Sequence, residues 1–168
     1  MLCVPDRHFR DVNPSSALRA SDEHDVSMTP DQDAVDATFP TDGVELTILR
    51  VVADLDRART FYRDVLGATE ISEYGGTSAV LQFQGSWVLL VTGGGPTPDK
   101  PRVTFAPPAD LDIVSHELTI RVPDCRAAYE ILSQRGAIFL TPPVEYEWEI
   151  RCFFRDPDGH LLEISQRR

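Results

Sequence analysis

Charged residues that could take part in binding or catalysis alternate with apolar residues in two segments near the end of the chain. In one segment Glu117 and Arg121 alternate with leucine, isoleucine and valine, and in the other Arg151 and Glu163 follow the same pattern. This alternation is typical of β-strands that turn one face to the core, so we expect the charged side chains together on the other face. There they could orient a ligand or form a purely structural ion network, and both interpretations stay open.

The second of these segments is predicted to fold as a hairpin. Residues 156–159 read Asp-Pro-Asp-Gly, in which proline sets φ for a type I turn and glycine takes the left-handed position. Pairing the two strands across this turn sets Phe153 opposite Glu163 and Arg151 opposite Ser165. The strand residues between them are apolar and are expected to face a helix.

A unit of one strand, one helix and three further strands precedes these segments. Its helix carries one apolar stripe, begins after Asp54, which is positioned to cap it, and ends at Gly67. The stripe consists of Ala58, Phe61, Tyr62, Val65 and Leu66. Strands are predicted at residues 44–53, 69–74, 78–84 and 86–92.

The same unit is predicted a second time in the last third of the chain. Asp124 and Gly136 bracket a second helix in the way that Asp54 and Gly67 bracket the first. Strands are predicted at residues 117–122, 137–141, 149–155 and 160–166. The sequence therefore predicts an α+β fold built from two tandem βαβββ modules.

Composition divides the chain into a tail and a folded part. Residues 1–42 carry nine acidic side chains against three arginines and show no sustained apolar period, so we expect a solvated, disordered tail of unreadable function. Residues 43–168 are expected to form one domain. Within it we define module one as residues 43–92, a linker opening with three glycines as residues 93–113, and module two as residues 114–168.

The overall charge and the apolar runs exclude some partners. A formal net charge of -11 disfavours binding to nucleic acid and to anionic membranes. No apolar run approaches the roughly 20 residues that span a bilayer, and the first residues do not resemble a leader peptide, so we expect a cytoplasmic protein. Cys125 and Cys152 fall on predicted core faces and are expected to be inert, and His160 is expected at an exposed turn.

Two motifs resemble the vicinal oxygen chelate superfamily, the group of glyoxalases, bleomycin resistance proteins and extradiol dioxygenases. The first is FYRDVLG at residues 61–67, preceded by Asp54 and Ala58, and the second is DPDGHLLEI at residues 156–164. The resemblance implies that the two modules form a cupped mixed sheet with the helices on the outer faces. It also makes a homodimer an expectation, because sheet edges of modules often pair in this superfamily.

The resemblance implies metal-ligand positions that this chain fills only in part. Counting from the motifs places them at Thr47, Leu89, Glu117 and Glu163. Leucine offers no lone pair and a threonine hydroxyl is a weak ligand, whereas transition-metal sites normally have three or more imidazole or carboxylate ligands. We therefore predict no cofactor and a lost metal site. If a divalent metal is retained, its ligands are expected to be Glu117, Glu163 and His116.

These observations lead to two hypotheses about function. The first is a metal-free protein that binds a small, partly apolar molecule with a polar or anionic group, in which Arg121 and Arg151 neutralise Glu117 and Glu163. The second is a divalent-metal-dependent lyase, isomerase or dioxygenase in which one of the two glutamates exchanges protons with the substrate. Trp148 is expected either to close over the cup or to cap the edge of the core. The full set of predicted ligand-binding residues is Thr47, Leu49, Leu89, Glu117, Thr119, Arg121, Trp148, Arg151, Phe153 and Glu163.

Overall fold

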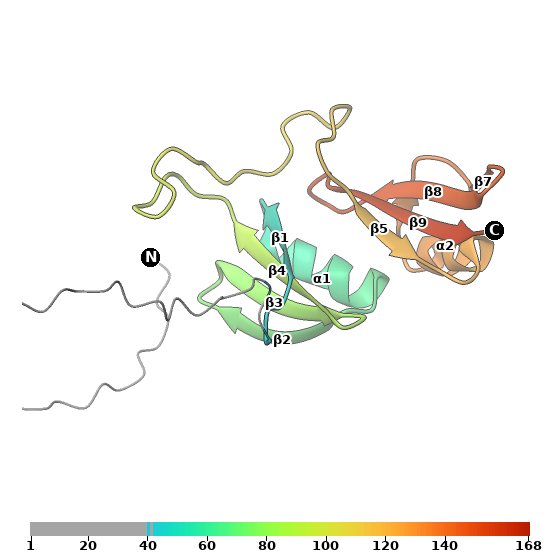
Figure 1. The fold of residues 1–168 in the computed structure, drawn as a ribbon. Helices are drawn as coiled ribbons and strands as arrows, with labels where there is room; N and C mark the ends of the chain where they lie inside the picture. The colour runs from blue at the N-terminus through green and yellow to red at the C-terminus, as the bar shows by residue number, and fades with distance from the viewer. Residues whose placement is uncertain (1–39, 41) are drawn as a thin grey trace, which may run out of the picture. The chain divides into compact units, whose positions relative to one another are not determined.

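Module one folds as a four-stranded sheet covered on one face by a helix. The computed structural model describes residue 40 and residues 42–168, so the predicted acidic tail lies almost entirely outside the described residues. The strands run in the order β1-β4-β3-β2, with β1 parallel to β4 and the other neighbours antiparallel (Figure 1). The strands are β1 Thr47–Val52, β2 Thr69–Tyr74, β3 Ser78–Phe83 and β4 Ser86–Thr92.

The first helix begins and ends where the sequence predicts. The side chain of Asp54 accepts a hydrogen bond from the backbone N–H of Arg57 over 3.0 Å and so caps α1, Leu55–Thr60. The helix widens into a π-helical turn, η1, Phe61–Val65, which the apolar spacing did not indicate. Gly67 follows with φ of 83°, a conformation that favours glycine.

Module two repeats this arrangement. Its sheet has the order β5-β9-β8-β6, with β5 parallel to β9, and the unpredicted short strand β7 pairs with β8. Asp124 caps α2, Cys125–Gln134, by accepting from Ala127 N–H over 2.9 Å. The strands are β5 Leu118–Arg121, β6 Ile138–Phe139, β7 Val144–Glu145, β8 Glu149–Arg155 and β9 Leu161–Arg167. The α+β fold with two βαβββ modules is thus confirmed, with the eight main strands divided between two sheets.

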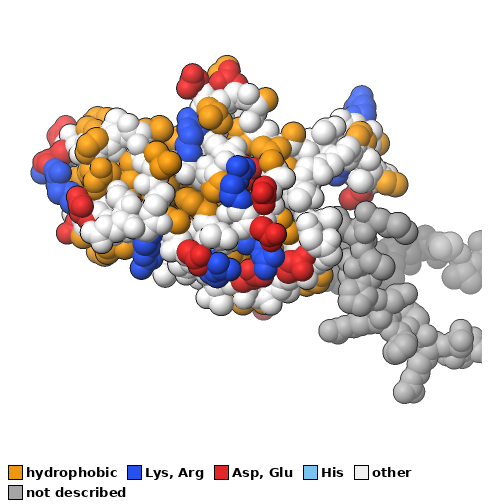
Figure 2. All heavy atoms as spheres, turned by 180° about the vertical axis from the view of Figure 1, so that it is seen from behind, with side chains coloured by type: hydrophobic (Ala, Val, Ile, Leu, Met, Phe, Trp, Pro, Cys, Tyr) orange, Lys and Arg blue, Asp and Glu red, His pale blue; other side chains and the backbone are white. Residues whose placement is uncertain are grey.

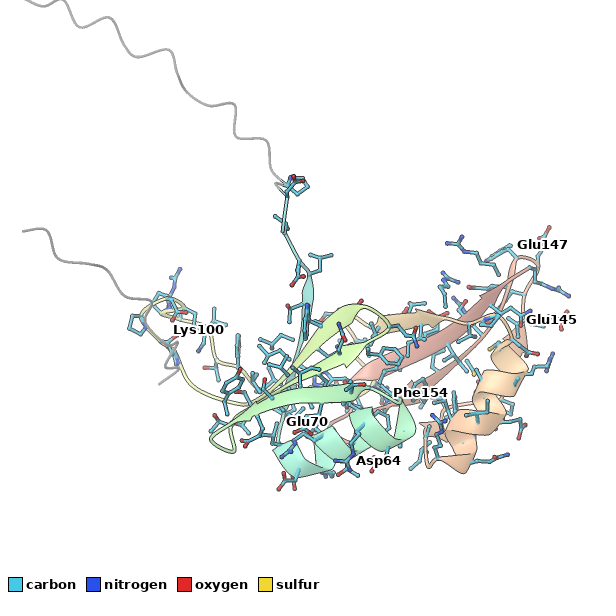
Figure 3. The ribbon with its side chains drawn as sticks, turned by 90° about the horizontal axis from the view of Figure 1, so that it is seen from below. Asp64, Glu70, Lys100, Glu145, Glu147 and Phe154 are labelled. Carbon is cyan, nitrogen blue, oxygen red and sulfur yellow. The ribbon has the colours of Figure 1, made fainter. Side chains whose placement is uncertain are left out.

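One hydrophobic core runs through both modules. Phe61 of η1 packs against Phe154 of β8 with ring centroids 6.5 Å apart. Tyr62 is buried and donates from its hydroxyl to Asp156 Oδ2 over 3.0 Å. Figure 3 shows Phe154 in the middle of the described unit, whereas Glu145 and Glu147 lie at the end of module two. The closing turn of module two therefore holds module two against the first helix of module one.

The linker crosses between the modules without a helix or a strand. Residues 93–113 contain only two isolated bridges among the described residues, one of which joins Gly94 to Phe105. Arg155 donates to the carbonyl oxygens of Leu111 and Gly159, which fastens the end of the linker to the closing turn. No helix of the described residues is long and apolar enough to cross a membrane. Figure 2 shows acidic and basic side chains side by side on one face, so that face carries no basic patch.

Candidate functional site

The face of the module-two sheet that lies opposite the helix gathers the predicted polar residues. The pairing of β8 with β9 sets Phe153 opposite Glu163 and Arg151 opposite Ser165, so the predicted register is confirmed. Parallel pairing of β5 with β9 adds Thr119 beside Glu163. The alternate residues of these strands are part of, or pack against, the core: Leu118, Ile120, Cys152, Phe154, Leu162 and Ile164. We call the polar side of this sheet the module-two face.

Two arginines of the module-two face, Arg121 and Arg151, pair with Glu149. Arg151 Nη1 lies 2.9 Å from Glu149 Oε1, and Arg121 Nη1 lies 3.4 Å from Glu149 Oε2. The hydroxyl of Ser165 donates to Glu149 Oε2 over 2.9 Å and accepts from Arg121 over 2.6 Å. The Ser165 hydrogen bond and the two arginines lower the pKa of Glu149. The prediction that these arginines neutralise Glu117 and Glu163 is therefore wrong, because among the described residues their ion pairs are with Glu149.

Arg151 is also held between two aromatic rings. Its guanidinium carbon lies 4.9 Å from the centroid of the Tyr146 ring and 5.5 Å from that of Phe153. Trp148 is 66% exposed, so it does not cap the edge of the core. These contacts hold Arg151 in place while leaving Trp148 in solvent at the border of the face.

Glu163 lies at the centre of the module-two face and is only 4% exposed. Its Oε2 accepts a hydrogen bond from the Thr119 hydroxyl over 3.0 Å, and its Oε1 is buried with no hydrogen-bond partner among the described residues. Glu117 Oε1 lies 3.4 Å from the same hydroxyl. Burial raises the pKa of Glu163, Thr119 opposes this, and the neighbouring Glu117 raises the pKa further.

The corresponding face of module one is largely apolar. Leu49 lies beside Leu89, and Thr47 beside Trp87, in the parallel pair of β1 and β4. Leu49 is 39% exposed, and Thr47 is exposed as well. Arg50 points the other way and is 2% exposed, where its charge acts on the hydroxyl of Tyr62. The sequence reasoning missed this buried arginine, although strand alternation places it on the core side.

Two of the four implied metal-ligand positions hold side chains that are poor ligands or none. Leu89 has only Leu49 beside it in β1, and Thr47 contributes a hydroxyl at best. Across residues 40 and 42–168, no group of three or more histidine, cysteine, aspartate and glutamate side chains could hold a metal ion. His116, Glu117 and Glu163 are thus not among such groups in this part of the chain. The residues present do not fit the metal ion that the resemblance implies.

A pocket of about 350 Å³ lies between the end of the linker and the closing turn. It does not include Glu117 or Glu163, but it reaches Leu161, which pairs with Arg155 on the same side of the sheet as Glu163. His116 and His160 also line it, with ring centroids 6.4 Å apart. The rest of the lining combines the apolar residues Ala106, Pro108, Ala109, Ile113 and Val114 with Asp110, Ser115, Arg155 and Gly159.

His160 is buried, which corrects the expectation of an exposed turn position. It is 6% exposed, and its Nε2 donates to the carbonyl oxygen of Val51 over 2.7 Å. The turn is tight, as predicted, with a hydrogen bond of 3.0 Å from Gly159 N–H to the Asp156 carbonyl. The local pattern could not show that this turn packs against module one.

The sequence of residues 44–164 matches the family described as Glyoxalase/Bleomycin resistance protein/Dioxygenase superfamily. The chain belongs to this superfamily. A curated superfamily relative, "Glutathione transferase FosA" of Serratia marcescens, is 31% identical over 114 residues, which cover 67% of this chain and 73% of that protein.

Two solved structures show the same superfamily fold at lower identity. The glyoxalase/bleomycin resistance protein/dioxygenase from Alicyclobacillus acidocaldarius has a TM-score of 0.58 at 20% identity, covering 74% of this chain and 92% of that chain. TnmS3, an antibiotic binding protein from Streptomyces sp. CB03234, has a TM-score of 0.53 at 21% identity, covering 74% and 96%. At this identity the likeness concerns the fold alone.

Proposed function

We propose that this superfamily member binds a small, partly apolar organic molecule at the module-two face and the adjoining pocket. The observation that carries the proposal is the buried Glu163 carboxyl, whose Oε1 has no partner among the residues that the structure describes, in a face otherwise rich in hydrogen bonds. A buried polar atom without a partner costs about 1 to 3 kcal/mol, and a ligand that donates to it recovers part of this. The antibiotic binding protein TnmS3 gives the proposal a precedent on the same fold.

The pocket supplies the apolar part of the proposed site. A volume of about 350 Å³ lies at the lower end of the range for small-molecule sites. Its apolar lining and the exposed aromatic residues Trp148 and Tyr146 suit burial of an apolar body. The predicted binding roles of Thr47, Leu49 and Leu89 stay predictions, and they concern the face of module one.

Thermal shift measurements against a ligand panel test this function. The panel contains apolar amines, apolar acids, neutral apolar alcohols and divalent metal ions. We expect organic ligands, and not metal ions, to raise the melting temperature in a concentration-dependent way. Arg121→Ala should weaken that response, because it loosens Glu149 and Ser165 on the same face. Arg63→Ala is the control, since Arg63 is exposed and pairs only with its neighbour Asp64 among the described residues.

A divalent-metal-dependent lyase, isomerase or dioxygenase is the second candidate. It is supported by the likeness to the glutathione transferase and by two carboxylates that share the Thr119 hydroxyl. Elemental analysis after purification without chelator decides between the two candidates. A stoichiometric first-row ion that is lost in Glu163→Gln would contradict the metal-free proposal.

A homodimer is the assembly that we propose for this protein. The apolar residues Leu46, Leu49 and Trp148 are 86%, 39% and 66% exposed in the single chain, and a second copy would cover such side chains. Light scattering after size exclusion should give twice the chain mass. The expected cytoplasmic location stays a prediction.

A further inference from the structure

The carboxyl groups of Glu117 and Glu163 lie near the same Thr119 hydroxyl and have no basic partner in the part of the chain that the structure describes. Arg121 and Arg151 are both engaged by Glu149, and Arg155 donates to the backbone carbonyl oxygens of Gly159 and Leu111. No ion pair within residues 40 and 42–168 includes Glu117 or Glu163. The ionised pair would place two like charges close together, one of them out of water, which is unfavourable.

The one hydroxyl between the two carboxyl groups cannot satisfy both. Thr119 has a single hydroxyl hydrogen, and its distances of 3.0 Å to Glu163 and 3.4 Å to Glu117 indicate that Glu163 receives it. Glu163 Oε1 then still lacks a donor among the described residues, although the residue is only 4% exposed. Among the described residues, the pair therefore lacks a positive charge, and Glu163 Oε1 lacks a hydrogen-bond donor.

The surroundings of the pair are suited to an organic group. Phe153 lies directly opposite Glu163 across β8 and β9, where side chains are close neighbours. Leu161, which lines the pocket, is two residues from Glu163 on the same face of β9, about 7 Å along the strand. Glu117 is exposed, so its side chain can turn aside to admit a ligand group.

We propose that Glu163 and Glu117 together bind the protonated amine of a ligand whose apolar body lies against Phe153 and extends toward the pocket. This inference rests on the proposed function and names its ligand class. An ammonium group brings up to three N–H donors and one positive charge, which are what the pair lacks. The amine would thus neutralise the two carboxyl groups, which is the role that the sequence predicts for Arg121 and Arg151.

An anionic group and a metal ion fit the same atoms less well. An anion would meet two carboxyl groups, while Arg121 and Arg151 are already bound to Glu149 and Arg155 of the pocket donates to two backbone carbonyl oxygens. A metal ion would find only two carboxylates and one hydroxyl. The choice of an amine follows from these partners.

Three probes with one body separate the ligand classes: phenylbutylamine, phenylbutanol and phenylbutyrate. Their affinities are measured by calorimetry at about pH 8, where the amine probe is protonated. We expect the amine to bind at least about tenfold more tightly than the alcohol, and the carboxylate to bind more weakly than both.

Charge-removing variants locate the amine. Glu163→Gln and the exposed Glu117→Gln should each lower the affinity for phenylbutylamine by about tenfold or more and leave the affinity for phenylbutanol unchanged. Glu130→Gln on α2 alters the net charge equally at an exposed site and should have no effect. The Glu117 variant keeps the test valid if the buried substitution affects folding.

Each outcome decides the inference. An amine preference that both variants abolish supports it. If phenylbutanol or phenylbutyrate binds as tightly as the amine, the ligand class is wrong while small-molecule binding stands. If no probe binds, or if manganese binds at Glu163 with one-to-one stoichiometry and blocks the amine, the inference is overturned, and the wider ligand panel decides the proposed function separately.

Discussion

The imidazole of His160 donates a hydrogen bond from Nε2 to the carbonyl oxygen of Val51 over 2.7 Å. A carbonyl oxygen only accepts, so Nε2 carries the hydrogen. The bond joins the closing turn of module two to the first strand of module one, and 6% exposure shields it from water. His160 is therefore a residue that couples the two modules.

Replacing His160 should destabilise the fold. His160→Ala removes a buried ring and leaves the Val51 carbonyl without its partner, so the free energy of unfolding should fall by about 2 to 4 kcal/mol. Urea denaturation followed by circular dichroism measures this. His116→Ala is the control, because His116 is exposed, and its effect should stay within about 0.5 kcal/mol. Equal effects of the two variants would show that the inter-module bond contributes nothing.

The hydroxyl of Tyr62 forms a second buried link between the modules. It donates to Asp156 Oδ2 over 3.0 Å, while Asp156 Oδ1 accepts from the backbone N–H groups of Asp158 and His160. Burial and the charge of Asp156 raise the pKa of Tyr62 well above its usual value. The hydroxyl therefore keeps its hydrogen throughout the neutral range.

Tyr62→Phe should lower the free energy of unfolding by about 1 to 2 kcal/mol, since Asp156 Oδ2 then loses its donor. Tyr74→Phe is a matched control, because Tyr74 is 58% exposed and its hydroxyl meets only Ser72 among the described residues. The same denaturation measurement serves both variants. A Tyr62 variant as stable as the unmodified chain would mean that water satisfies Asp156 equally well.

The two buried cysteines should resist thiol reagents while the protein is folded. Burial raises the pKa of Cys125, and burial together with Cys125 raises that of Cys152 to about 12. A shift from 9.0 to about 12 reduces the thiolate at neutral pH roughly a thousandfold. In a Cys3→Ser background, Ellman's reagent should react with Cys125 and Cys152 only after denaturant is added. Prompt reaction of the folded protein would disprove this burial.

Strand alternation predicted which side chains share the module-two face, because a period of two follows from backbone geometry alone. It did not predict which charges pair. Arg121 and Glu149 lie on the two strands that flank β9, so their contact depends on the order of strands in the sheet. The sequence did contain a hint of the pairing. Glu149 is two residues from Arg151, so strand alternation places both side chains on the same face of β8. The burial of His160 had no local signal, because it depends on how one module packs against the other.

The raised pKa of Glu163 should make stability fall as pH rises. Between its ordinary value of 4.5 and its raised pKa in the folded state, the folded protein holds a proton that the unfolded chain has lost. The unfolded state then binds fewer protons, so the free energy of unfolding decreases with pH through this window and stays lower above it. Carboxyl groups with lowered pKa values, such as Glu149, act in the opposite direction at lower pH.

Glu163→Gln should remove this loss of stability. Its amide can accept from Thr119 and donate to Glu117, so at about pH 8 the variant should be more stable than the unmodified chain by about 1 kcal/mol, with the gain vanishing toward about pH 4. Urea midpoints across this pH range, with Glu130→Gln as the control for net charge, provide the measurement. A variant that is less stable at every pH would show that the carboxylate of Glu163 has a partner that stabilises its charge.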